Sequence, residues 1–212
     1  MNARERTYRR SKAHNTQWAT DSKGLFKGNT RVRVKDASTV QVLSHLFAKD
    51  SECVYYVMGV AKAVVDPESF EAMPDRVRPR AGEYEGACGY ARDKFHVYFA
   101  YRMSGSPKIL RKADRDTFQV LGKGRARDHQ YVWAQDTLIK GADPATFELI
   151  DDVYSKDARR VYYDGAPLPG ADPRAFRVIG KSTGADQSSV YRLREKLVGA
   201  DPATYHCTDD DD

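Results

Sequence analysis

Hydrophobic and polar positions recur along the chain with a period of 29 residues. The string Gly-Ala-Asp-Pro stands at 141–144, 170–173 and 199–202, and a short apolar run such as Val161-Tyr162-Tyr163 precedes it. Self-similarity at a fixed spacing is the signature of a repeat architecture. The pattern therefore predicts a chain built from copies of one short supersecondary unit.

Two aspartates frame each copy, and an apolar residue follows the second aspartate by four positions. The opening aspartates are Asp21, Asp50, Asp93, Asp128, Asp157 and Asp186. The closing aspartates are Asp36, Asp66, Asp114, Asp143, Asp172 and Asp201. The apolar residues, called closing aromatics here although the first is aliphatic, are Val40, Phe70, Phe118, Phe147, Phe176 and Tyr205. Six repeats, numbered 1 to 6, thus tile residues 18–208.

The residue types within a repeat predict its local structure. Aspartate favours turns, and β-branched and aromatic residues favour strands, so the runs on both sides of each opening aspartate read as two strands joined by a turn. Asp164-Gly165 marks a hairpin after the second run. The Asp-Pro pair that closes a repeat predicts one short helical turn, with the aspartate as its cap.

A unit this short cannot bury its own apolar face and must stack on its neighbours. We therefore predict a mainly β fold: a tandem repeat of about six 29-residue units, each with short strands, a hairpin and one capped helical turn, on one continuous core. The recurring tyrosines are expected in that core, with their hydroxyl groups at its edge. Whether the stack is open or closes into a ring stays undecided.

The chain resembles the DKNYY repeat family of bacterial proteins. Asp93-Lys94-Phe95-His96-Val97-Tyr98-Phe99 is similar to the opening of the family's repeat, and residues 139–147 are similar to its close. The resemblance is specific for repeats 3 to 6 and looser for repeats 1 and 2. It implies no enzymatic activity. Many members of the family are envelope-associated, which this chain, without a secretory signal after Met1, is not expected to follow.

Charge is distributed unevenly along the chain. The net charge is +5, but the basic side chains concentrate in an N-terminal arm, residues 1–17, and its surroundings, while Asp209 to Asp212 form an acidic tail. The repeats between are nearly neutral, so nucleic acid is a disfavoured partner. No apolar run reaches the roughly 20 residues of a membrane helix. The sequence predicts a cytoplasmic protein, in keeping with three scattered cysteines, Cys53, Cys88 and Cys207.

Motifs of enzymes and cofactor sites are missing from the sequence. It contains no G-x-S-x-G, no P-loop and no H-E-x-x-H, and its five histidines stand apart, so no catalytic residue and no cofactor are predicted. A zinc site from His206, Cys207 and a remote cysteine is disfavoured. Calcium is disfavoured too, because the regularly spaced aspartates do not cluster as they do in calcium loops.

Two insertions break the period, at 75–89 in repeat 2 and at 101–108 in repeat 3. Arginine, tyrosine and methionine in loops on a rigid scaffold are residue types that bind protein partners. The predicted partner-binding residues are Arg76, Arg78, Arg80, Tyr84, Tyr101, Arg102 and Met103. The preferred function is a non-enzymatic protein-binding module, concretely an immunity-type protein that neutralises a bacterial toxin. The alternatives are a structural or cell-envelope repeat module and a nucleic-acid binder that uses the basic arm.

Overall fold

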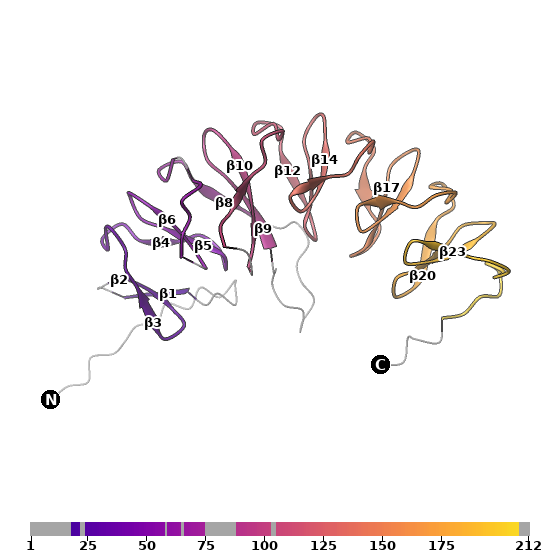
Figure 1. The fold of residues 1–212 in the computed structure, drawn as a ribbon, viewed down its shortest axis with the longest axis horizontal. Helices are drawn as coiled ribbons and strands as arrows, with labels where there is room; N and C mark the ends of the chain where they lie inside the picture. The colour runs from indigo at the N-terminus through magenta and orange to yellow at the C-terminus, as the bar shows by residue number, and fades with distance from the viewer. Residues whose placement is uncertain are drawn as a thin grey trace. The chain divides into compact units, whose positions relative to one another are not determined.

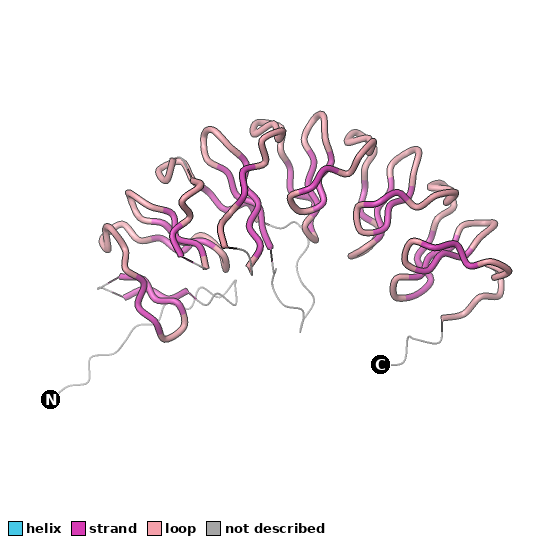
Figure 2. Tube along the Cα trace, in the orientation of Figure 1, coloured by secondary structure: helices cyan, strands magenta, loops and turns pink. Residues whose placement is uncertain are grey.

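A computed structural model of the chain describes residues 18–21, 24–57, 59–64, 66–74, 88–102 and 105–207. These residues form short β-strands joined by turns, and none of them belongs to a helix (Figure 2). The mainly β prediction is confirmed. The chain divides into two compact units, an N-terminal half of residues 1–124 and a C-terminal half of residues 125–212, which are described separately.

The N-terminal half contains three antiparallel sheets and one further strand (Figure 1). The first sheet has β1 (Trp18–Asp21), β2 (Gly24–Lys27) and β3 (Thr30–Val32). The second has β4 (Gln41–Val42), β5 (Phe47–Lys49), β6 (Val54–Tyr56) and β7 (Gly59–Val60). The third has β8 (Glu71–Met73), β9 (Cys88–Arg92), β10 (Val97–Tyr101) and β11 (Lys108–Ile109). The further strand is β12 (Gln119–Gly122).

The C-terminal half repeats the same meander. It begins with β13 (Arg125–Arg127), β14 (Val132–Ala134) and β15 (Thr137–Leu138). The next sheet has β16 (Glu148–Leu149), β17 (Tyr154–Lys156), β18 (Val161–Tyr163) and β19 (Ala166–Pro167). The last has β20 (Arg177–Gly180), β21 (Thr183–Ala185), β22 (Val190–Arg192) and β23 (Glu195–Leu197).

A complete sheet has four strands, and its first strand comes from the preceding repeat. Strand β16 directly follows the closing aromatic Phe147 of repeat 4, yet it pairs with β17 of repeat 5, Glu148 opposite Lys156. The sequence pattern predicts only two or three strands per repeat. It misses the first strand because that strand has only two to four residues and no alternating pattern. Within each half, sharing a strand ties one repeat to the next by backbone hydrogen bonds.

The predicted hairpin at Asp164-Gly165 is confirmed between β18 and β19. Both residues have positive φ, 46° and 77°. A two-residue hairpin turn needs this left-handed conformation at both positions because it matches the twist of the strands, and Asp-Gly adopts it readily.

The closing aromatics join the repeats of each half. The ring of Phe176 lies 5.0 Å from that of Tyr154 in repeat 5 and 6.2 Å from that of Tyr191 in repeat 6. In the N-terminal half, Phe70 lies 5.2 Å from Phe47 and 5.9 Å from Tyr98 in the same way. Phe70 and Phe176 therefore bury apolar surface between two repeats, which stabilises each contact by a few kcal/mol.

The sheet offers a small residue where the closing aromatic of the preceding repeat packs. At Gly184 an added Cβ would lie 2.2 Å from Cζ of Phe176. The same position, two residues before the opening aspartate, is small throughout: Ala19, Ala48, Ala91, Ala126, Ser155 and Gly184. Ring and small residue thus form a matched pair between repeats.

The capped turn that closes each repeat is present, although it is a single turn and not a helix. In repeat 4, Oδ1 of Asp143 accepts the Ala145 amide at 3.0 Å, and the Asp143 carbonyl accepts the Thr146 amide at 3.3 Å. Equivalent carboxylate caps are made by Asp36, Asp66, Asp114, Asp172 and Asp201. The capping role predicted for the closing aspartates is confirmed.

Candidate protein-binding surface

The opening aspartates are buried hydrogen-bond centres. In repeat 5, Oδ1 of Asp157 accepts the amides of Arg159 and Arg160 at 2.7 and 2.8 Å, which forms the turn between β17 and β18. Oδ2 accepts the Tyr162 hydroxyl at 2.7 Å. Asp157 is only 3% exposed. The turn role predicted for this residue is correct, but the sequence did not indicate its burial.

Four repeats share this bond between carboxylate and tyrosine. The hydroxyl five residues after the opening aspartate donates to it in Tyr55–Asp50, Tyr98–Asp93, Tyr162–Asp157 and Tyr191–Asp186, at 2.5, 2.6, 2.7 and 3.2 Å. These hydroxyl groups are buried on a carboxylate, not placed at the edge of the core as predicted. Repeat 4 carries Trp133 in place of this tyrosine, and its Asp128 accepts the two turn amides of Gln130 and Tyr131.

The same carboxylates also hold the preceding repeat. Oδ2 of Asp157 accepts the backbone amide of the closing Asp143 at 3.0 Å, and Oδ2 of Asp186 accepts that of Asp172 at 3.0 Å. In the N-terminal half the pairs are Asp36 to Asp50 and Asp66 to Asp93, at 3.0 and 3.1 Å. We call this arrangement, in which one opening carboxylate binds its own turn, its tyrosine and the preceding closing amide, the aspartate clamp.

Hydrogen bonding keeps the clamp ionised. Burial alone would raise the pKa of Asp157, but the bonds from the Asp143 amide, the Tyr162 hydroxyl and the turn amides outweigh it, so the pKa lies below its ordinary value. The pKa values of Asp50, Asp93 and Asp186 are lowered in the same way against the effect of burial. The donors replace the water that a buried charge loses.

In several repeats a cation binds the capped turn. Lys156 donates to the Pro173 carbonyl at 3.2 Å, and Arg127 donates to the Pro144 carbonyl at 2.7 Å. In repeat 6 the equivalent residue is Ala185, and the directly opposite residue on β20, Arg177, donates to the Pro202 carbonyl at 2.9 Å instead. The carbonyl of this turn is therefore bound by a cation from the neighbouring strand of the sheet.

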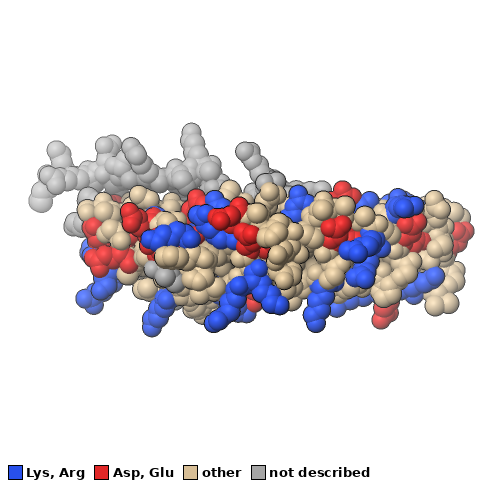
Figure 3. Space-filling view, turned by 90° about the horizontal axis from the view of Figure 1, so that it is seen from above, with Lys and Arg blue, Asp and Glu red and all other residues tan. Residues whose placement is uncertain are grey.

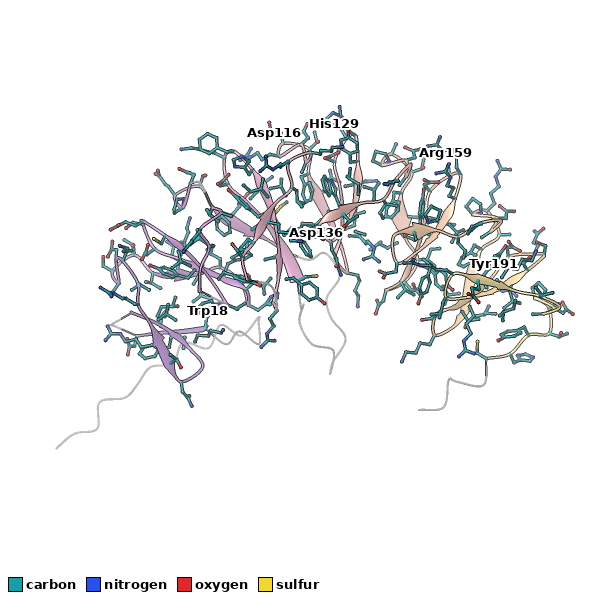
Figure 4. All side chains as sticks on the ribbon, viewed as in Figure 1. Trp18, Asp116, His129, Asp136, Arg159 and Tyr191 are labelled. Carbon is teal, nitrogen blue, oxygen red and sulfur yellow. The ribbon has the colours of Figure 1, made fainter. Side chains whose placement is uncertain are left out.

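The turn end of each sheet is therefore engaged in holding the repeats together. Figure 4 places His129 and Arg159 at this end in the C-terminal half and Asp136, in the hairpin after β14, at the other end. Variation in a binding surface is easier to accommodate at the hairpin end, where the bonds of the aspartate clamp are absent.

Both insertions leave the third sheet at its hairpin end. Strand β9 begins at Cys88, near the end of the first insertion, and β10 ends at Tyr101, the first residue of the second insertion. These two residues are paired opposite each other. Tyr101 is 39% exposed and Arg102 is half-buried. The other predicted partner-binding residues, Arg76, Arg78, Arg80, Tyr84 and Met103, lie outside the described residues. The strand ends thus direct both connections to one end of one sheet.

Positive and negative side chains are interspersed on the face in Figure 3. Among the residues with a described position, no group of three or more His, Cys, Asp or Glu side chains is placed to hold a metal ion. Nor does that part of the chain include a helix with the length and apolar character to span a bilayer.

Fold and clamp together define the class: a mainly β tandem-repeat protein whose repeats are joined by buried carboxylates. The chain matches the DKNYY family over residues 18–195 and belongs to that family. No curated protein and no solved structure matches it.

Proposed function

We propose that this chain is a non-enzymatic protein-binding module, and concretely an immunity-type protein that neutralises a bacterial toxin in the cytoplasm by direct binding. The observation that carries the proposal is the common origin of the two insertions. Their connections meet the third sheet at Cys88 and Tyr101, which face each other across β9 and β10. A binding surface built on one rigid sheet end needs no rearrangement of the scaffold.

The chemistry of these loops favours a protein partner. Arginine and tyrosine dominate binding hot spots because they bury a large area and form several hydrogen bonds. The insertions contribute Arg76, Arg78, Arg80, Tyr84, Tyr101, Arg102 and Met103. The arginines of the two insertions would pair with carboxylates on an acidic partner surface.

The buried polar groups of the repeat support a scaffold role. The opening carboxylates are bound by tyrosine hydroxyl groups and backbone amides in the clamp, and the closing carboxylates cap turns. The polar residues of the clamps and caps therefore have structural partners, and recognition of a partner protein is left to the residues of the insertions.

The test begins with affinity capture from the native host and identification of the bound protein. The identified protein is then titrated against the wild type, a Tyr101→Ala/Arg102→Ala variant and a variant with residues 75–89 shortened by 14. We expect each change to weaken binding by more than ~2 kcal/mol. Arg174→Ala is the matched control, because this exposed residue lies on a capped turn, and its affinity should equal that of the wild type.

A protection assay tests the immunity role itself. Cells that express the captured protein should die without this chain and survive with it, and the loop variants should fail to protect. Unchanged binding by the loop variants, with loss in an Arg4, Arg6, Arg9, Arg10→Ala variant, would move the site to the basic arm. Binding of DNA in place of protein by that arm would replace the proposal.

A further inference from the structure

The junction between two interior repeats is a recurring interface with three parts. A closing aromatic packs over a small residue and a tyrosine of the next repeat, as Phe176 does over Gly184 and Tyr191. The next opening carboxylate accepts the closing amide, as in the aspartate clamp. The residues after the closing aromatic add a first strand to the next sheet, as β20 does for β21.

The first repeat presents the receiving half of such a junction. Ala19 and Phe26 occupy the positions of the small residue and the tyrosine, and they pair across β1 and β2. Both are half-buried, whereas the interior equivalents Ala91 and Tyr98 are fully buried. The opening Asp21 is exposed. Within the described residues the first sheet has three strands and starts at β1, where the other sheets have a strand from a preceding repeat.

The last repeat presents the inserting half. Its closing aromatic Tyr205 is half-buried, whereas the closing Phe70, Phe118, Phe147 and Phe176 are at most 7% exposed. The closing Asp201 is exposed, and its carboxylate caps the final turn as in other repeats. His206 and Cys207 follow in the place from which a first strand is supplied elsewhere.

Polar groups and charge match across these two ends as well. Arg192 stands six residues after its opening aspartate, the position of Lys27, which donates to the Val57 carbonyl of the following repeat. The equivalent acceptor on a first repeat is the Gly28 carbonyl. The chain before β1 carries five basic residues and one acidic residue, and four aspartates follow the last repeat. Opposite charges at the two ends favour their approach.

We propose that copies of this chain associate head to tail, with the C-terminal face of repeat 6 docked on the N-terminal face of repeat 1 of a second copy. Tyr205 packs over Ala19 and Phe26, the Asp21 carboxylate accepts the Asp201 amide, and the strand after Tyr205 pairs with β1. Such an interface is heterologous, so each copy keeps one face of each kind for further copies. The inference goes beyond the proposed function and does not depend on a toxin partner.

Two variants that each block one face test the proposal. Ala19→Arg places a long charged side chain on the receiving face, and Tyr205→Arg removes the inserting ring. Both positions are half-buried at an end of the stack, so the melting temperature should stay close to that of the wild type. Light scattering from micromolar to submillimolar concentration should show the mean mass of the wild type rising past a dimer, and each variant remaining a monomer.

Mixing the two blocked variants separates this interface from a symmetric one. The mixture should form dimers and nothing larger, because one intact tail and one intact head remain. High salt should weaken the association, since salt screens the attraction between opposite charges. A monomeric wild type at every concentration would overturn the proposal, and so would single variants that still associate or a mixture that stays monomeric.

A disulfide reports the predicted register. Interior sheets pair the second residue after a closing aromatic with the small residue, as Ala72 with Ala91 and Leu149 with Ser155. Cys207 of one copy should therefore lie opposite position 19 of the next. Ala19→Cys should form covalent oligomers on mild oxidation, and Ala19→Cys with Cys207→Ser should not. Equal crosslinking in both would contradict this register, and the proposal with it.

Discussion

Repeats 3 and 5 share one clamp and differ at the opposite end of their sheets. Tyr98 donates to Asp93 at 2.6 Å, and Tyr162 donates to Asp157 at 2.7 Å. Strands β9 and β10 have five residues each, whereas β17 and β18 have three. Repeat 5 turns back through Asp164-Gly165, but both hairpin-end connections of the third sheet carry insertions. One end of the repeat is fixed by buried charge, and the other end accepts extra chain.

The largest expected effect is acid unfolding, because protonation acts on every clamp together. The pKa of Asp50, Asp93, Asp157 and Asp186 is lowered in the folded protein. A lowered pKa contributes stability that is present above the ordinary aspartate value of about 3.9 and is lost as the pH falls through the folded value. Denaturant midpoints should be flat at neutral pH and fall steeply below about pH 4. A midpoint that does not change with acid would contradict the ionised clamp.

Loss of a closing aromatic should be the largest effect of a single substitution. Phe176→Ala and Phe70→Ala each empty a site between two repeats, and each should lower the free energy of unfolding by ~3–5 kcal/mol. Equal losses in the two halves are expected, because both rings contact an aromatic residue of the same repeat and a tyrosine of the next. Chemical denaturation measures the effect, and wild-type stability in either variant would contradict the stacked-repeat architecture.

Removal of a clamp carboxylate should come next in size. Asp93→Ala and Asp157→Ala leave buried amide and hydroxyl donors without an acceptor, so each should cost ~2–4 kcal/mol. Asp172→Ala, which removes an exposed cap, should cost ~1 kcal/mol and serves as the control. If repeat 3 tolerated the change and repeat 5 did not, the clamp would not be the shared part of the two repeats.

The sequence was sufficient to predict the repeat frame, the turns and the caps, because these depend on local residue types. Asp164-Gly165 and the closing Asp-Pro pairs determine their own backbone conformation. The strand shared between repeats was missed, since residues such as Glu148 and Leu149 carry no strand pattern and pair only in the folded stack. The burial of Asp157 was missed for a related reason: one of its four donors, the Asp143 amide, comes from another repeat.

For the predicted partner-binding residues, the sequence indicates where they lie but not what they bind. Periodicity revealed where the insertions lie, and the pairing of Cys88 with Tyr101 adds that both connections begin at one sheet end. Recognition depends on residues outside the repeat, so the pattern that predicts the fold contains no information about the partner. The resemblance of Ala19, Phe26 and Tyr205 at the two ends to the residues of interior junctions became visible only when their exposure could be compared.

The smallest expected effect concerns a difference inside the shared core of repeats 3 and 5. Ser155 occupies the small-residue position of repeat 5, and its buried hydroxyl finds no hydrogen-bond partner among the described residues. Repeat 3 has Ala91 there. A buried hydroxyl without a partner is destabilising, so Ser155→Ala should raise the free energy of unfolding by about 1 kcal/mol.

The reciprocal Ala91→Ser should lower the free energy of unfolding by a similar amount. A chain with both substitutions should return close to the wild-type value because the two sites are independent. Denaturant unfolding at matched pH resolves these changes, and a loss of stability in Ser155→Ala would show that the hydroxyl has a partner in solution.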